Sequence, residues 1–358
     1  MVAPEHSTRM PAVNPVTEHY LIIGPTWVGD MVMSQSLFMS LKQRHPDCKI
    51  TVMALNWTLP LLTRMPQVDN SVNLPIGHGQ LRIRDRYALG KQLHRGGYTT
   101  AIVLPNSFKS ALIPYFARIP HRIGWRGEWR DLLLNDCRQL DEAALPLMVQ
   151  RFVSLGYRDK AELPGRLPRP QLLIDDSARQ QALASFKLHA HARTLAICPG
   201  AEFGPSKQWP ARHYSALCNQ LIVAGWQVWI FGSGNDKEFA AAILSGVDDG
   251  KLAHCRNLAG STTLAQAIDL MSAVSAVVSN DSGLMHIAAA LNLPLVAIFG
   301  STSPDFTPPL SERAKLLSTE IDCRPCFKRE CPYGHLRCLT ELAPERVVAA
   351  LHELANAA

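Results

Sequence analysis

The sequence predicts an α/β protein made of two domains, each containing a parallel sheet covered by helices on both faces. The chain has 358 residues, which is more than one ordinary hydrophobic core contains, so two domains are expected. Strand-like and helical patterns alternate in both halves of the chain, which is typical of parallel sheets. Between the halves, Leu163–Pro170 is rich in proline, glycine and arginine, and we expect it to be the linker.

The first domain is expected over residues 20–165. It follows a polar, proline-interrupted tail of residues 1–19 that has no apolar core of a secretory signal. The expected strands are Tyr20–Gly24, Lys49–Ala54 and Thr99–Leu104, and the expected helices are Asp30–His45 and Ser107–Arg118.

The second domain is expected over residues 166–343 and repeats this alternation without repeating the sequence. The expected strands are Thr194–Cys198, Gln227–Gly232, Val274–Ser279 and Leu295–Gly300, and the expected helices are Pro210–Ala224, Asp236–Leu244, Thr263–Met271 and Ser282–Leu291. A last helix is expected over residues 344–358. Apolar residues line one of its faces, and we expect this helix to cross back onto the first domain.

The turn after the first predicted strand, Gly24–Asp30, is the first candidate site. In open α/β sheets, ligands bind at the carboxyl ends of the strands. Asp30 is well placed there as a general base, although capping of its helix is the alternative, which these residues alone favour. The glycine spacing imitates a phosphate-binding P-loop, but Asp30 stands where that motif needs a lysine, so we do not expect phosphate here. Gly29 is expected to belong to the turn.

Two loops of the second domain carry residues suited to a ligand with a diphosphate and a ribose. Lys207 precedes a predicted helix, where its charge and free backbone amides suit a diphosphate. Gly232-x-Gly234 supplies two glycines of a dinucleotide fingerprint but lacks the third. The acids that follow, Asp236 or Glu238, could hold ribose hydroxyls, with ordinary acids of a helix start as the alternative.

A third loop, Asn280–His286, ends at the start of another predicted helix. Asp281 and Ser282 stand at that start, and Gly283 would let a ligand approach the backbone closely. His286 taken alone is more simply explained as a histidine packed within the helix.

Positive charge is concentrated in residues 82–130. The net charge of the chain is +6 and its isoelectric point is about 8.9. This concentration predicts a basic face towards an anionic partner, namely nucleic acid, anionic lipid or a phosphorylated acceptor. A solvated surface is the alternative for most of these residues. Arginines interleaved with tryptophans can hold a sugar face and a phosphate; the candidates are Arg122, Arg126 and Arg130, beside Trp125 and Trp129.

The nine cysteines are expected to be reduced or bound to metal. No apolar run is long enough to span a bilayer, so we expect the protein in the cytosol, where disulfides are rare. Four cysteines resemble a structural zinc knuckle, with His335 as a further ligand candidate and free thiols or disulfides as the alternatives; they are Cys323, Cys326, Cys331 and Cys338. Nothing in the sequence connects this segment to Asp30.

Five motifs that occur in order resemble the lipopolysaccharide core heptosyltransferases. The resemblance runs from about Tyr20 to the last helix. The motifs are Gly24-Pro-Thr-Trp-Val-Gly-Asp30, Leu104-Pro-Asn-Ser-Phe-Lys-Ser110, Cys198-Pro-Gly-Ala-Glu-Phe-Gly204, Lys207-Gln-Trp-Pro210 and Asn280-Asp-Ser-Gly-Leu-Met-His286.

This resemblance implies a GT-B glycosyltransferase, in which two Rossmann-like domains face a central cleft that holds the active site. It implies an inverting transfer of heptose from ADP-heptose to heptosyl-Kdo-lipid A. That acceptor lies at the cytoplasmic face of the inner membrane, to which the enzyme would bind peripherally. Type II enzymes are the nearest, with types I and III as alternatives. No cofactor is expected for the catalysis.

The resemblance also implies roles for individual residues. Asp30 would be the base, and an inverting transfer needs only one. Lys207 would contact the donor diphosphate, and Asp236 or Glu238 the ribose. The donor pocket would be lined by Asp281, Ser282, Gly283, Leu284 and His286. The phosphates of lipid A would meet Lys109, Arg122, Arg126 and Arg130. No Asp-x-Asp pattern occurs in the chain, so the sequence does not indicate a metal-assisted diphosphate.

Two other classes of protein remain as alternatives. A nicotinamide-dependent oxidoreductase would use Gly232-x-Gly234 as its dinucleotide loop. A nucleic-acid-binding or metal-knuckle interaction protein would use the basic stretch and the cysteines, but this alternative leaves the loop that ends in Lys207 without a role.

Overall fold

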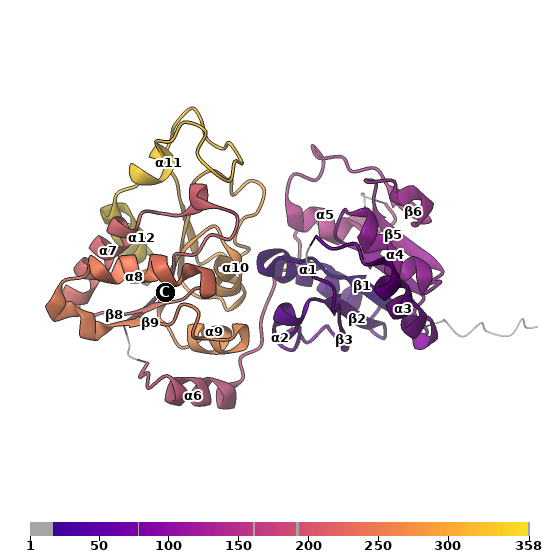
Figure 1. Cartoon of the computed structure of the whole chain (residues 1–358), viewed down its shortest axis with the longest axis horizontal. Helices are drawn as coiled ribbons and strands as arrows, with labels where there is room; N and C mark the ends of the chain where they lie inside the picture. The colour runs from indigo at the N-terminus through magenta and orange to yellow at the C-terminus, as the bar shows by residue number, and fades with distance from the viewer. Residues whose placement is uncertain (1–16, 78, 160–161, 191–192, 357–358) are drawn as a thin grey trace, which may run out of the picture.

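The computed structural model describes residues 17–77, 79–159, 162–190 and 193–356, and this part of the chain forms two α/β domains side by side (Figure 1). Each domain contains a parallel sheet of six strands. The predicted fold class is therefore confirmed. The predicted tail lies outside the described residues up to residue 16, and His19 already belongs to the first strand.

The first domain is organised around β1, whose residues Leu21 and Ile22 have no exposed surface. Ile22 pairs with Val52 on one side and with Ile102 on the other. The strands have the order β3-β2-β1-β4-β5-β6. They are β1 (His19–Ile23), β2 (Lys49–Ala54), β3 (Asn70–Asn73), β4 (Thr100–Val103), β5 (His121–Trp125) and β6 (Asp136–Arg138).

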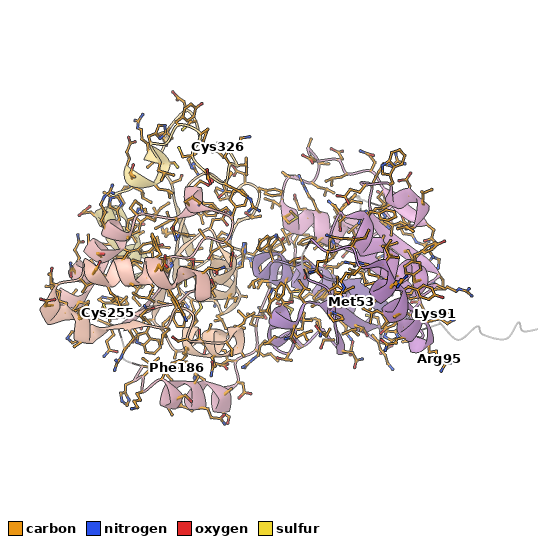
Figure 2. The ribbon with its side chains drawn as sticks, in the orientation of Figure 1. Met53, Lys91, Arg95, Phe186, Cys255 and Cys326 are labelled. Atoms are coloured by element: carbon orange, nitrogen blue, oxygen red, sulfur yellow. The ribbon has the colours of Figure 1, made fainter. Side chains whose placement is uncertain are left out.

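Helices cover both faces of this sheet. The helices are α1 (Val28–Arg44), α2 (Leu59–Leu62), α3 (Ile83–Leu93), α4 (Phe108–Phe116) and α5 (Met148–Ser154). On one face α1 packs against α5, and on the other α3 packs against α4. Met53 of β2 lies in the core under α3 and α4 (Figure 2).

The second domain repeats this arrangement with the strand order β12-β11-β10-β7-β8-β9. Its strands are β7 (Thr194–Cys198), β8 (Gln227–Ile230), β9 (Cys255–Asn257), β10 (Ala276–Asn280), β11 (Leu295–Ile298) and β12 (Ala314–Leu317). Its helices are α6 (Asp176–Ser185), α7 (Ala211–Val223), α8 (Lys237–Ser245), α9 (Leu264–Met271), α10 (Gly283–Ala290), α11 (Arg337–Thr340) and α12 (Pro344–Asn356).

Every predicted strand and helix up to residue 291, and β11 after it, is observed with ends that differ by at most two residues. The strands that the sequence did not reveal are β3, β5, β6, β9 and β12, which lie at or next to sheet edges and lack a fully buried apolar run. The prediction that the last helix crosses back was wrong. Instead, α12 packs on α7, β11 and β12, because its apolar face completes the core of the second domain.

The two domains meet where α1 packs against α10. Gly29 of α1 faces His286 of α10, and a Cβ atom at Gly29 would come within 2.7 Å of the ring carbon Cδ2 of His286. Gly283 of α10 faces Val28, and a Cβ atom there would lie 2.9 Å from the Cβ atom of Val28. Because glycine has no side chain, these two positions allow the helix starts to touch.

A buried ion pair also joins the domains. Arg64, which follows α2, lies 2.6 Å from Asp269 of α9, and the two side chains are only 10% and 4% exposed. Burial raises the pKa of Asp269, while the charge of Arg64 lowers it. Each charge in this dry contact therefore depends on the other.

We predict that Arg64→Ala destabilises the protein by about 3 kcal/mol or more, because it leaves the Asp269 carboxylate buried without its cation. The expected result is a fall in Tm of several degrees, measured by calorimetry. The double variant Arg64→Met/Asp269→Leu should recover most of the loss, since apolar replacement of both partners removes both buried charges.

The control is the exposed pair of Lys315 and Glu353, whose side chains are 48% and 63% exposed. Lys315→Ala should cost less than about 1 kcal/mol. Equal effects of Arg64→Ala and Lys315→Ala would show that the buried pair does not hold the domains together.

Candidate active site at the domain junction

Asp30 lies in the first turn of α1, two residues after the helix begins at Val28. Trp27 occupies the capping position, so the alternative that Asp30 only caps the helix is wrong. Gly29 is also part of the helix, whereas the sequence had suggested that it belongs to the turn. Its lack of a side chain serves the contact with His286 instead.

The environment of Asp30 changes its acidity. Its pKa is raised to about 6, first because burial removes water from the carboxylate. The charge of Lys207 lowers this pKa and the charge of Asp281 raises it. Asp30 belongs to the first domain, whereas Lys207 and Asp281 belong to the second. The three charges therefore act on one another across the domain junction, and the carboxylate is poised to exchange a proton near neutral pH.

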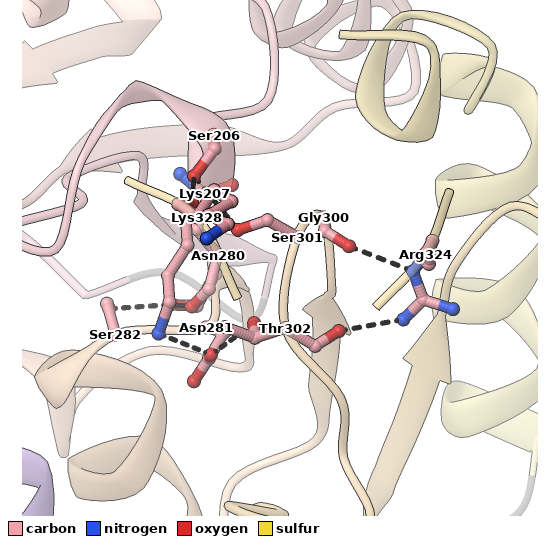
Figure 3. A network of polar contacts seen from close by, with 11 residues as sticks. Ser206, Lys207, Asn280, Asp281, Ser282, Gly300, Ser301, Thr302, Arg324 and Lys328 are labelled. Carbon is pink, nitrogen blue, oxygen red and sulfur yellow. Dashed lines mark hydrogen bonds and ion pairs between the residues drawn. The ribbon is translucent and has the colours of Figure 1, made fainter. Parts of the chain in front are cut away.

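Lys207 and Asp281 form a buried ion pair in a network of polar contacts (Figure 3). Lys207 ends the short helical turn Pro205–Lys207, and Asp281 directly follows β10. The ammonium nitrogen lies 2.6 Å from Oδ2 of Asp281, which also accepts a hydrogen bond of 2.6 Å from Thr302. The lysine nitrogen also lies 4.9 Å from the centre of the Phe203 ring. The cation is thus held in one place at the end of the second sheet.

His286 is a neutral, buried contact between the domains. Burial lowers its pKa to about 4, and the charge of Asp281 opposes this while that of Lys207 adds to it. Its ring packs against the backbone of Gly29. The imidazole therefore helps to place Asp30 beside the ion pair.

The start of α10 has free hydrogen-bonding capacity. Ser282 precedes the helix, but its side chain does not cap it and lies 3.3 Å from the Ser279 hydroxyl. The first backbone amides of α10 are therefore available to an anion. Gly283 contacts Val28 of α1, so its expected approach to a ligand is replaced by an approach between helices. Leu284 is partly buried against the core of the domains.

The two predicted ribose acids differ in their surroundings. Asp236 accepts hydrogen bonds of 2.7 Å and 2.8 Å from the backbone nitrogen and hydroxyl of Ser233. Its carboxylate also faces Gly200, where a Cβ atom would lie 2.6 Å away. Asp236 therefore stabilises the start of its own helix and lies beside the loop that leads to Lys207. Glu238 is exposed. Contact of either acid with a ribose stays a prediction.

Two of the predicted acceptor residues are structural. Arg130 has no exposed surface, and its guanidinium donates hydrogen bonds to the carbonyls of Pro105 and Trp125. Arg122 donates to the carbonyls of Leu133 and Ile119 at 2.7 Å and 2.6 Å. The predicted direct contact with an acceptor is therefore wrong for Arg130, and Arg122 already binds backbone.

The other two candidates remain accessible. Arg126 is exposed and directly follows β5, and Trp129 beside it is 80% exposed. Lys109 is partly exposed in the first turn of α4, directly after the loop that follows β4. Both basic residues thus lie near the carboxyl ends of the strands, on the same edge of the sheet as Asp30. Their contact with an acceptor stays a prediction.

The four cysteines of the predicted zinc knuckle have free thiols and line one cavity of about 10 Å³ together with His335. Burial and the other three thiols raise the pKa of Cys338 to about 11. In the described part of the chain, however, no three cysteine, histidine or acidic side chains are arranged so that they could hold a metal ion. A structural zinc ion therefore stays a prediction.

The same cavity is lined by Ser206 and Ser301, which are neighbours of Lys207 and Thr302. The sequence indicated no connection between the cysteine segment and Asp30, and the structure connects this segment instead to the neighbours of Lys207 and Thr302. Sequence reasoning also missed Thr302, the second partner of Asp281, because it lies 21 positions away and belongs to no recognisable motif.

Comparisons with known proteins agree with this arrangement. The family model for glycosyltransferase family 9 (heptosyltransferase) matches residues 86–337. Lipopolysaccharide heptosyltransferase 2 of Salmonella typhimurium is 50% identical, covering 93% of this chain and 97% of its own. Lipooligosaccharide heptosyltransferase 2 of Haemophilus ducreyi is 48% identical, covering 93% and 98%.

The solved structure of ADP-heptose lipopolysaccharide heptosyltransferase II from Escherichia coli superposes with a TM-score of 0.85 at 47% identity, covering 94% of this chain and 98% of that one. The oxidoreductase and nucleic-acid-binding alternatives are thereby excluded as the family of this protein. The chain belongs to glycosyltransferase family 9, the heptosyltransferases.

Proposed function

We propose that this protein transfers heptose from ADP-heptose to the heptosyl-Kdo-lipid A acceptor of lipopolysaccharide core biosynthesis, with inversion at the anomeric carbon. The observation that carries the proposal is Asp30, a carboxylate with a raised pKa beside the Lys207–Asp281 pair at the domain junction. The similar proteins are type II heptosyltransferases, which supports a type II enzyme over types I and III.

Asp30 supplies the base for this reaction. Attack by an acceptor hydroxyl on the anomeric carbon forms the new glycosidic bond, and Asp30 takes the hydroxyl proton as the bond forms. With a pKa of about 6, Asp30 is mostly ionised at neutral pH and still basic enough to accept a proton. ADP leaves from the opposite side of the sugar.

The second domain stabilises the leaving group. Negative charge grows on the diphosphate as its bond to heptose breaks, and Lys207 and the free amides of α10 offer positive charge and hydrogen bonds to it. Asp281 fixes the position of Lys207 before the donor binds. The two domains thus divide the work between proton transfer and departure of ADP.

Membrane attachment is part of this proposal, because the proposed acceptor is anchored in a bilayer. Within the described residues, no helix is long and apolar enough to cross one. The outer face of α3 and α4 supports surface binding instead. It exposes apolar side chains, which are Leu81 (46%), Ile83 (50%), Tyr87 (49%) and Tyr115 (44%).

Two of these side chains, Tyr87 and Tyr115, belong to one patch. The Tyr87 and Tyr115 rings both lie against Phe116, with centroids 5.3 Å and 5.7 Å from its own. Lys91 lies over the Tyr87 ring. The exposed basic residues Arg84, Lys91, Arg95 and Arg118, here called the basic rim, lie on these two helices or just after them. Lys91 and Arg95 lie at the end of the first domain away from the second (Figure 2). Apolar groups within a basic rim suit a negatively charged lipid surface.

The proposed transfer predicts a specific assay result. The purified protein should convert heptosyl-Kdo-lipid A with ADP-heptose, and it should act poorly on Kdo-lipid A. Asp30→Asn should lower kcat about 10²- to 10⁴-fold, since it removes the base without changing the shape of the side chain. Products are measured by mass spectrometry.

Two measurements control this assay. Asp30→Asn should be at least as stable as the wild type, because it removes a buried charge, and it should still bind ADP, because Lys207 and the start of α10 are unchanged. Wild-type turnover by Asp30→Asn would remove Asp30 from the chemistry, and a preference for Kdo-lipid A would reject the type II assignment.

The charges around Asp30 predict opposite pH shifts in two variants. In the wild type, kcat/KM should rise with pH through about 6, because only ionised Asp30 accepts a proton. Lys207→Met removes a charge that lowers the pKa of Asp30, so the rise should move to higher pH. Asp281→Asn removes a charge that raises it, so the rise should move to lower pH. Lys207→Arg keeps the charge and should leave the profile near that of wild type. Unmoved profiles in both neutral variants would contradict the coupling.

The membrane proposal predicts weaker binding when the basic rim is neutralised. Arg84→Gln/Lys91→Gln should bind vesicles containing phosphatidylglycerol roughly 25-fold more weakly, since each basic residue near an anionic surface contributes about a factor of five. Co-sedimentation measures the affinity. Arg212→Gln/Arg256→Gln, which removes two exposed charges from the second domain, should bind like the wild type. Equal binding by the two double variants, or equal wild-type binding to neutral vesicles, would reject this surface.

A further inference from the structure

The segment between β12 and α11 has no role in the mechanism derived so far. Residues 318–336, here called the cysteine loop, contain neither helix nor strand. Together with Cys338 of α11, the loop places its thiols around the small cavity shared with Ser206 and Ser301. A loop of this length without helix or strand is uncommon in a compact domain and usually has a function.

The cysteine loop is hydrogen-bonded to the short helical turn that carries Lys207. Ser206 donates its backbone nitrogen to the carbonyl of Arg329 at 3.2 Å, and its hydroxyl donates to the carbonyl of Lys328. Gly204 lies against the same carbonyl of Arg329, where any Cβ atom would collide with it. Gly204 also has a φ of 150°, which favours glycine. The residues directly before Lys207 are therefore held in place by contacts with the cysteine loop.

The loop is also bound to the segment that carries Thr302. Arg324 donates from Nε to the carbonyl of Gly300 at 2.9 Å and from Nη2 to the carbonyl of Thr302 at 3.1 Å (Figure 3). Phe327 donates its backbone nitrogen to the carbonyl of Ser301 at 2.8 Å. Thr302 in turn donates its hydroxyl to Asp281. One end of this chain of contacts is Arg324 and the other is the Lys207–Asp281 pair.

We propose that the cysteine loop is a positioning element for the diphosphate site, and that Arg324 is its main positioning residue. The loop holds both partners of the ion pair by separate routes, through Ser206 to Lys207 and through Thr302 to Asp281. The Ser206 and Ser301 hydroxyls, 2.9 Å apart, join the two routes. Arg324 suits this task because its planar guanidinium can span two carbonyls of one turn, which a single ammonium group cannot do as rigidly.

The test is ADP binding by Arg324→Gln, measured by calorimetry. Misplacement of catalytic groups by about an ångström can cost up to 100-fold, so we expect the Kd for ADP to rise roughly 10-fold or more. The KM for ADP-heptose should rise in parallel, while the KM for the acceptor should stay within about two-fold of wild type, because Asp30 and its domain are untouched. Arg324→Lys should recover part of the loss.

Arg313→Gln is the matched control, because Arg313 also donates to a carbonyl, that of Asn292, but far from the ion pair. It should bind ADP like the wild type. If Arg324→Gln does not fold, Ser301→Ala tests the same link through the Ser206 hydroxyl and should also weaken ADP binding. Wild-type ADP affinity in a folded Arg324 or Ser301 variant would overturn the proposal.

The kinetic part of this test rests on the proposed function, but ADP binding does not need the acceptor or the sugar. If the wild-type protein binds ADP but transfers no heptose, and Arg324→Gln weakens ADP binding, the proposed function is rejected and the positioning role is kept.

Discussion

The contact between the starts of α1 and α10 is the constraint on which the site depends. Gly29 and Gly283 leave room for the side chains of His286 and Val28, so that the two helix starts pack closely against each other. At this end, α1 carries the Asp30 carboxylate and α10 carries backbone amides without a side-chain cap. The contact brings the Asp30 carboxylate, from one sheet, under the influence of Lys207 and Asp281 from the other. Neither domain alone could produce that environment.

This environment is costly to maintain. Raising the pKa of Asp30 to about 6 means that its ionised form is less stable in the folded protein than in water. Stability therefore falls as pH rises from the ordinary pKa of an aspartate to about 6, where the folded protein must release the proton it had kept. The buried pairs of Lys207 with Asp281 and of Arg64 with Asp269 add desolvated charge. Closely packed apolar cores on both faces of each sheet offset these costs.

Much of the architecture could be predicted because local patterns of the sequence specify it. Runs such as Thr194–Cys198 are fully buried and continuous, so their strands were evident. The Gly29-Asp30 and Asp281–His286 motifs pointed to two helix starts that the structure brings together. What could not be predicted depends on distant partners. Arg130 looked like a ligand for phosphate, but the carbonyls of Pro105 and of Trp125 at the end of β5 bind it. The role of Gly29 required knowledge of His286, and the link from Arg324 to Thr302 joins segments that share no pattern.

The most direct test is a titration of the Asp30 carboxyl itself in the whole protein. Carbon-13 NMR of protein labelled at the aspartate carboxyl carbon, with Asp30→Asn used to assign the signal, reports its pKa without any assay of activity. We expect a midpoint near 6, which moves upward in Lys207→Met. A midpoint near 4 that does not move in Lys207→Met would show that Asp30 is an ordinary solvated carboxylate and that the domains do not form a shared site.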